Sequence, residues 1–257
     1  MIISHSHKFI FIKSLKTAGT SIEAALSGHC GGKDVVVPIN DYAYNRDEKG
    51  EFIHRGMNAD ETYRKIGQHV DAATIHIRES EQVWNRYFKF SITRNPWDRA
   101  LSYFFWDRRN DAALKPKKRL WHYLGVPFDE FAIVRDQFTR FLHEKALART
   151  DDPRFYVSDG ANRYRVPAEG FLENNDRFYI LDGELCADFV IRYEHLEEDY
   201  DEVCRRVGIP VTGLPHLKTG IRKQRRPYTD YYTDETREIV ATLHANDLRH
   251  FGYRFGG

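Results

Sequence analysis

The sequence predicts an α/β fold of the P-loop-like, three-layer kind, in which helices flank a central, mainly parallel sheet. Residues 9–12 form a continuous apolar run, as expected for a strand buried on both faces. The order strand, polar turn, helix recurs at residues 87–106, and strand-like and helical segments alternate afterwards. Because no fixed-period repeat or low-complexity linker divides the chain, we expect one domain over residues 1–257.

Composition narrows the class of protein. The net charge of +1 gives no global attraction to nucleic acid or to an anionic membrane, so any anion site must be built locally. Cys30, Cys186 and Cys204 are far apart and form no CxxC pair, which favours ordinary buried thiols over a disulfide framework or a zinc site. No apolar stretch approaches the roughly 20 residues that span a bilayer, and the early first strand leaves no room for a signal peptide. We expect a cytoplasmic protein without an integral membrane segment.

In the first half of the chain, residue type, spacing and capping residues predict each strand and helix. Residues 34–37 carry three valines and are expected to form a second strand, and the polar residues 40–60 are expected to form a loop. Residues 72–84 have helical spacing. Within residues 87–106, Asn95 can cap the helix and Pro96 suits its first position, where a missing N–H costs nothing.

The second half alternates in the same way. Apolar residues between 127 and 147 recur near a 3.6 period and predict a helix, namely Phe128, Phe131, Phe138, Phe141 and Leu142. Residues 150–176 are expected to be irregular, and residues 177–181 and 188–193 are strand-like. A helix is expected over residues 195–207 and is stopped by Gly208. Another follows Thr233, with acidic residues in its first turn.

Residues 14–21, SLKTAGTS, lie between the first strand and a helix start, where backbone N–H groups and the positive helix dipole converge. Gly19 lets the backbone approach a ligand and Lys16 adds a positive charge, while hydroxyls come from Thr17, Thr20 and Ser21. The Walker pattern is absent, because Lys16 precedes the glycine. Taken alone, the loop is either an anion site or a capped helix with an incidental surface lysine.

A second strand–turn–helix unit adds Arg94 at the end of its strand and Ser102 eight residues later, about two helical turns on. Two such units side by side could hold two separate phosphates of one nucleotide. The order of the loops argues against a P-loop kinase or other phosphoryl transferase, and the net charge argues against a nucleic-acid binder. A nucleotide-binding protein without catalytic activity stays open as an alternative.

These motifs resemble those of the PAPS-dependent sulfotransferases, specifically the bacterial and carbohydrate-acting branch. IKSLKTAGTSIE is similar to that family's 5′-phosphosulfate loop, and FSITRNPWDRALSYF to its 3′-phosphate motif. FVIRYEHLEEDYDEVCRRVGI and YYTDETREIVATLHANDLRHFGYRF resemble its later strand–helix unit and terminal helix. The stretch from about 107 to 176 matches no motif.

The resemblance implies a donor and roles for these residues. The donor would be PAPS, with PAP as product and no metal, and the acceptor would be a hydroxyl of a glycan or glycolipid. Lys16 would contact the bridging oxygen and the leaving phosphate, and Arg94 and Ser102 would hold the 3′-phosphate. The 5′-phosphate would be cradled by Thr17, Ala18, Gly19, Thr20 and Ser21. The family usually has Pro before the Lys, whereas this chain has Leu15, which leaves the turn less constrained.

The acceptor hydroxyl needs a base, and a histidine suits the task. His69 lies in IGQHVDAATIHIRES, which resembles the family's short His motif; a structural or surface role for His69 is the alternative. His76 and Glu23 are further candidates, although an exposed helix glutamate is favoured for Glu23.

Basic and aromatic residues elsewhere have two possible roles each. The segment around Arg222, Lys223, Arg225 and Arg226 either folds over the nucleotide or is a solvated surface run. The loop at 115–119, KPKKR, is expected to lie in solvent, with an acidic acceptor as the alternative ligand. Trp97 and Trp106 are expected to be core residues rather than adenine-stacking platforms.

Overall fold

The computed structural model describes residues 1–37, 58–108, 129–147, 156–159, 162–165, 175–215, 217 and 226–257. The chain forms two compact units. The first unit comprises Met1–Arg94, Arg154–Pro167 and Asn175–Thr219, and the second comprises Asn95–Pro153, Ala168–Asn174 and Gly220–Gly257. This division does not test the expectation of one domain, which stays a prediction.

The first unit is built on a five-stranded sheet with the order β3-β1-β2-β4-β9. Its strands are β1 (Ile2–Ser4), β2 (Phe9–Phe11), β3 (Val35–Val36), β4 (Phe88–Thr93) and β9 (Phe189–Arg192). β2, β4 and β9 are parallel neighbours, with Phe9 opposite Phe88 and Phe90 opposite Phe189. β1 runs antiparallel to both β2 and β3. The predicted mainly parallel sheet is therefore confirmed, and the short β1 is an addition that the sequence did not predict.

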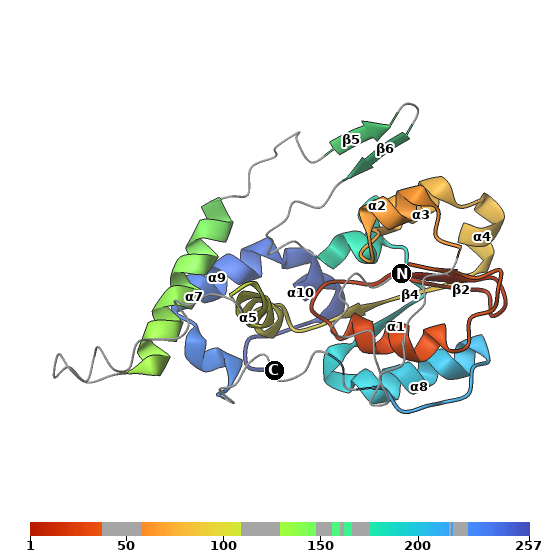
Figure 1. Ribbon diagram of the computed structural model, residues 1–257. Helices are drawn as coiled ribbons and strands as arrows, with labels where there is room; N and C mark the ends of the chain where they lie inside the picture. Colours follow the sequence, from red (N-terminus) through yellow and green to blue (C-terminus); the bar gives the residue numbers. More distant parts are fainter. Residues whose placement is uncertain are drawn as a thin grey trace. The chain divides into compact units, whose positions relative to one another are not determined.

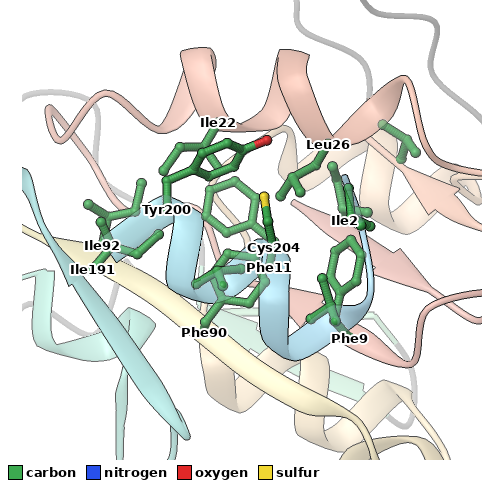
Figure 2. Close-up of a cluster of buried hydrophobic side chains, with 14 residues drawn as sticks. Ile2, Phe9, Phe11, Ile22, Leu26, Phe90, Ile92, Ile191, Tyr200 and Cys204 are labelled. Carbon is green, nitrogen blue, oxygen red and sulfur yellow. The ribbon is translucent and has the colours of Figure 1, made fainter. Parts of the chain in front are cut away.

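Helices cover both faces of this sheet (Figure 1). α1 (Gly19–Ser27) and α8 (Leu196–Val207) lie on one face, and α2 (Glu61–Ile66), α3 (Ala72–Arg78) and α4 (Glu81–Arg86) lie on the other. Figure 2 shows how Ile22 of α1 and Tyr200 of α8 pack over Phe11 and Phe90 in the core between sheet and helices. The helices thus complete the three layers that the sequence predicted.

Several local predictions need correction. The helix expected over residues 72–84 is two helices, because Ser80 accepts a hydrogen bond from Val83 N and so caps a new one. Residues 177–181 contribute only the short β7 (Ile180–Leu181), which pairs with β8 (Glu184–Leu185) outside the main sheet and follows the 3-10 helix η4 (Asn175–Phe178). The stretch 150–176, expected to be irregular, contains a hairpin of β5 (Tyr156–Asp159) and β6 (Asn162–Arg165).

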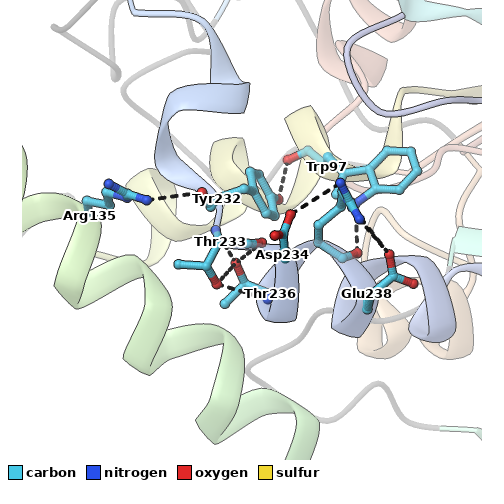
Figure 3. Close-up of polar contacts among 8 residues, drawn as sticks. Trp97, Arg135, Tyr232, Thr233, Asp234, Thr236 and Glu238 are labelled. Carbon is cyan, nitrogen blue, oxygen red and sulfur yellow. Dashed lines mark hydrogen bonds and ion pairs between the residues drawn. The ribbon is translucent and has the colours of Figure 1, made fainter.

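Every described element of the second unit is helical. They are α5 (Pro96–Asp107), α7 (Glu130–Leu147), the 3-10 helix η6 (Tyr228–Tyr231), α9 (Asp234–Leu243) and α10 (Ala245–Phe251). Phe104 of α5 packs against Phe138 and Phe141 of α7 at the centre of an aromatic core. Thr233 and Thr236 form a capping box at the start of α9, visible in Figure 3.

Two hydrogen bonds of this unit hold Trp97 in place. The Trp97 ring nitrogen donates to Arg237 O over 3.0 Å, and Tyr232 donates its hydroxyl to Trp97 O over 2.7 Å (Figure 3). Trp97 is buried, which confirms its expected core role, whereas Trp106 is only half-buried. Asn95 accepts a hydrogen bond from Trp97 N and caps α5, as predicted.

Candidate active site

The polar loop after β2 lies at the edge of the sheet where the parallel strands end. Because β2, β4 and β9 share a direction, their carboxyl ends meet at this edge, where open α/β sheets commonly bind ligands. The loop leads from β2 into α1, Arg94 directly follows β4, and Tyr193 directly follows β9. The first unit therefore places the predicted 5′-phosphate loop and Arg94 at the same edge.

Two residues of the loop have left-handed backbone conformations. Lys16 has φ 61° and Ala18 has φ 66°, a region that costs a residue with a Cβ roughly 1–2 kcal/mol. Ala18 is the N-cap of α1, and no side chain caps this helix. The first N–H groups of a helix mostly lack an acceptor within the helix, although Ser21 N of α1 donates to Ala18 O over 2.9 Å. Such an arrangement of backbone N–H groups is suited to an anion.

Hydrogen bonds attach the loop to β4 and to Leu217. The Ser14 hydroxyl lies 2.5 Å from Ile92 O of β4 and 2.7 Å from the Thr17 hydroxyl. The Ser21 hydroxyl accepts a bond of 3.2 Å from Leu217 N. Thr17 and Ser21, predicted as phosphate ligands, thus also have structural bonds, while Thr20 and Gly19 begin the buried first turn of α1.

Arg94 binds the same loop from the neighbouring strand. Its Nη1 donates to Lys16 O over 3.1 Å, and its guanidinium lies 4.0 Å from the centre of the Tyr193 ring. The side chain is half-buried and carries a permanent positive charge. The structure therefore brings Lys16 and Arg94 together, as the predicted nucleotide site requires.

A buried ion pair lies beneath the loop. Lys13 Nζ is 2.5 Å from Glu23 Oε2 and 2.5 Å from Gln68 Oε1, and both charged side chains are almost fully buried. The other carboxylate oxygen of Glu23 is 2.5 Å from the Met1 amine. The interpretation of Glu23 as an exposed helix glutamate was therefore wrong. Both oxygens of its carboxylate are occupied, one by Lys13 and one by the Met1 amine, so Glu23 is poorly placed to act as the base.

Lys13 also explains the glycine of the loop. A Cβ added to Gly19 would lie 2.8 Å from Lys13 Cγ, closer than real Cβ atoms approach another heavy atom. The far end of Lys13 is fixed by Glu23 and Gln68, so the side chain has little freedom to move aside. Gly19 is therefore required for the packing of Lys13 under α1.

His69 is attached to the same strand end. Its Nδ1 lies 3.0 Å from Lys13 O, and its ring makes an edge contact with Phe178. Burial lowers the pKa of His69 well below 6.5, and the Lys13 cation lowers it further. The imidazole is thus neutral at physiological pH. His76, the alternative base, is exposed and packs on Trp84.

The other predicted ligands belong to the second unit or lie outside the described residues. Ser102 is half-buried on α5, and Arg226 is exposed, with its guanidinium 4.3 Å from the Phe131 ring centre and 4.0 Å from Asp230. Arg222, Lys223 and Arg225 lie outside the described residues, as does the loop at 115–119. The roles of Ser102, Arg222 and Arg226 stay predictions.

Sequence reasoning missed three residues around the loop: Lys13, Gln68 and Asn175. Asn175 holds both backbone groups of Leu15, with Oδ1 3.2 Å from Leu15 N and Nδ2 2.9 Å from Leu15 O. A lysine at the end of an apolar strand was a visible signal for Lys13, since a lysine there needs a buried partner. No local pattern marks Asn175, which is 160 residues from Leu15.

None of the helices described is long and apolar enough to cross a membrane. Within the residues that the structure describes, no group of three or more His, Cys, Asp and Glu side chains is arranged to hold a metal ion. The three cysteines are free thiols, with Cys204 buried and Cys30 and Cys186 half-buried.

Comparison with known proteins identifies the family. The model of the sulfotransferase family matches residues 1–149, more than half of the 257 residues, and this region contains the loop, His69 and Arg94. No curated protein and no solved structure matches the chain significantly. The family match agrees with a mainly parallel sheet flanked by helices. The chain belongs to the sulfotransferase family.

Proposed function

We propose that this sulfotransferase moves the sulfuryl group of PAPS to a hydroxyl of a carbohydrate or glycolipid and releases PAP. The observation that carries the proposal is the uncapped N-terminus of α1 next to Lys16, with Arg94 bound to the same loop. Two positively charged side chains beside the start of a helix suit a nucleotide with separate phosphates at its 5′ and 3′ positions.

Each residue has a distinct role in donor binding. The N–H groups at the start of α1 and the hydroxyl of Thr20 hold the 5′-phosphate, and Lys16 lies at the bridging oxygen. Arg94 holds the 3′-phosphate together with Ser102. The basic residues Arg222 and Arg226 add positive charge for the nucleotide. Arg94 is suited to its role because its planar guanidinium binds phosphate with two parallel hydrogen bonds.

PAPS supplies a sulfuryl group whose bond to the 5′-phosphate oxygen breaks as the bond to the acceptor oxygen forms. Lys16 and the α1 N–H groups neutralise the negative charge that grows on the departing phosphate. Preorganised donors of this kind are worth about 10²–10³ in rate. Neutral His69 takes the proton of the acceptor hydroxyl on Nε2, because its Nδ1–H is directed at Lys13 O.

The preference for a sugar hydroxyl rests on the resemblance of the two phosphate motifs to the carbohydrate-acting branch. We expect acceptor choice to depend on residues 107–176, of which 150–176 lie outside the family match at 1–149. Fold alone does not specify an acceptor. A panel of acceptors is therefore needed rather than a single substrate.

The test is transfer of label from ³⁵S-PAPS to a panel of glycans, glycolipids and simple alcohols, in the presence of EDTA. We expect a labelled glycan or glycolipid, and a rate about 10²–10³ lower for Lys16→Met. Exposed Lys33 offers a control, and Lys33→Met should retain the wild-type rate. No transfer to any acceptor, together with metal-dependent transfer of phosphate from ATP, would favour the kinase alternative.

A further inference from the structure

Within the first unit, the side chain of Asn175 contacts Leu15, a residue 160 positions away in the sequence. Its Oδ1 accepts a bond of 3.2 Å from Leu15 N, and its Nδ2 donates a bond of 2.9 Å to Leu15 O. Asn175 is 1% exposed and Leu15 is half-buried, so both bonds are partly shielded from water. One carboxamide therefore satisfies both backbone groups of a single loop residue.

Leu15 is the residue directly before Lys16. Lys16 has a left-handed backbone, which its own side chain disfavours, so the preceding peptide must be held in place by its surroundings. A proline at position 15 would restrain φ covalently, but leucine leaves φ free and adds an N–H that needs an acceptor. The two bonds from Asn175 supply both the restraint and the acceptor.

The short helix that carries Asn175 also contacts the predicted base. Phe178 is three residues later in η4 and packs edge-on against His69, with ring centres 6.3 Å apart. Residues three apart lie on the same side of a 3-10 helix. Arg177 packs on the Phe178 ring, with its guanidinium 4.7 Å from the ring centre. One turn of helix thus contacts both the lysine loop and the histidine.

We propose that Asn175 is a positioning residue for the sulfuryl-transfer site, which holds the Lys16 loop in its nucleotide-binding conformation through the two backbone bonds to Leu15. The inference rests on the proposed function and deepens it, because it assigns the restraint of the donor loop to a residue from outside the family match at 1–149. Asn175 acts through Leu15 and Lys16 and does not itself contact the nucleotide.

The experiment measures PAP affinity by isothermal titration in wild type, Asn175→Ala, Leu15→Pro and the double variant. We expect Asn175→Ala to bind PAP about tenfold more weakly or worse, as the loss of two ordinary hydrogen bonds implies. Leu15→Pro should recover affinity in the Asn175→Ala background, where it restrains φ and removes the orphaned N–H. In the wild-type background, it should give no gain, because it leaves Asn175 Oδ1 without its donor.

Hydrogen exchange at Leu15 and a control variant distinguish a role of Asn175 in positioning the loop from a general effect on stability. Hydrogen exchange of the peptide containing Leu15 should accelerate in Asn175→Ala. Asn58 is a matched control, since its side-chain amide also makes two bonds to the backbone. Its Nδ2 donates to Gly32 O and Asp34 O, away from the loop. Asn58→Ala should lower the thermal midpoint and leave PAP affinity unchanged. Should Asn175→Ala not fold, Asn175→Gln keeps the amide but displaces it, and the same loss of affinity is expected.

Two outcomes overturn the proposal. One is a folded Asn175→Ala or Asn175→Gln variant that binds PAP as tightly as wild type. The other is a loss of PAP affinity that Leu15→Pro deepens, with Leu15 exchange unchanged. Failure of the proposed function looks different, because wild-type protein would then bind PAP no better than 5′-AMP and show no transfer from PAPS.

Discussion

The Nδ1 atom of His69 lies 3.0 Å from the carbonyl oxygen of Lys13. A carbonyl oxygen only accepts hydrogen bonds, so Nδ1 must carry the proton of the neutral ring. The lone pair of the imidazole is therefore on Nε2, on the opposite side of the ring from Lys13. This contact fixes the tautomer of the predicted base and ties it to the strand end from which the Lys16 loop starts.

The first prediction concerns the pH dependence of sulfuryl transfer. Burial and the nearby Lys13 cation hold the pKa of His69 well below 6.5, so we expect the base to be fully active across neutral pH. The rate should be constant above about pH 6.5 and decrease only as pH falls through the lowered pKa. The measurement is kcat against pH with saturating PAPS. A rate that halves near pH 6.5 or above contradicts a neutral His69 with a lowered pKa.

The same shift affects stability. Between its lowered folded pKa and about 6.5, His69 binds protons more readily in the unfolded chain, so the stability of the folded state should decrease as pH falls below about 6.5. Urea unfolding at one pH above 6.5 and one pH below it measures the change in the free energy of unfolding. The dependence should be weaker in His69→Gln, and the exposed His76→Gln variant serves as the control with wild-type dependence.

The second prediction concerns the Lys13–Glu23 ion pair. Removal of one partner from a buried pair leaves an uncompensated charge and costs about 3–5 kcal/mol. Lys13→Met and Glu23→Gln should therefore each destabilise the protein strongly, and the double variant should lose less than the sum of the two. Urea denaturation gives the free energies of unfolding.

The exposed pair of Lys65 and Glu61 provides the control, with side chains 62% and 83% exposed. Lys65→Met should change the free energy of unfolding by less than about 1 kcal/mol. Equal effects of Lys13→Met and Lys65→Met would show that the Lys13–Glu23 pair does not support the loop.

The third prediction concerns Gly19. An alanine Cβ would lie 2.8 Å from Lys13 Cγ, so Gly19→Ala must displace Lys13 or the start of α1. We expect a loss of about 1–3 kcal/mol in stability, typical of overpacking, and weaker binding of PAP. Gly32 is exposed and has nothing within 4 Å of an added Cβ, so Gly32→Ala is the matched control. Wild-type PAP affinity in Gly19→Ala would contradict the close packing of Lys13 under the loop.

The sequence predicted the elements that local patterns specify. The strand at β2, the Asn95 cap and the Gly208 stop of α8 each depend on neighbouring residues, and each is confirmed. The strand expected over 177–181 is only the two-residue β7, and β5 was not predicted, because pairing of short strands depends on their partners rather than on hydrophobic period. The helix break at Ser80 shows a cap overriding a continuous apolar spacing.

The candidate site was predictable to a similar extent. Lys16 and Arg94 were recognised because strand–turn–helix units place them, and the structure joins them through the Arg94 bond to Lys16 O. Lys13, Gln68 and Asn175 were missed because their roles arise from contacts across long sequence separations. Burial of Glu23 was likewise invisible, since the groups that make its buried carboxylate tolerable, Lys13 and the Met1 amine, are 10 and 22 residues away.

The most direct test of the central claim is isothermal titration of PAP and of 5′-AMP into wild-type protein and Arg94→Ala. PAP and 5′-AMP differ only in the 3′-phosphate, which Arg94 is proposed to bind. We predict that wild type binds PAP more tightly than 5′-AMP and that Arg94→Ala removes the difference. Equal binding of the two nucleotides by wild type, or a preference for PAP that survives in Arg94→Ala, would contradict the assignment of this site to PAPS.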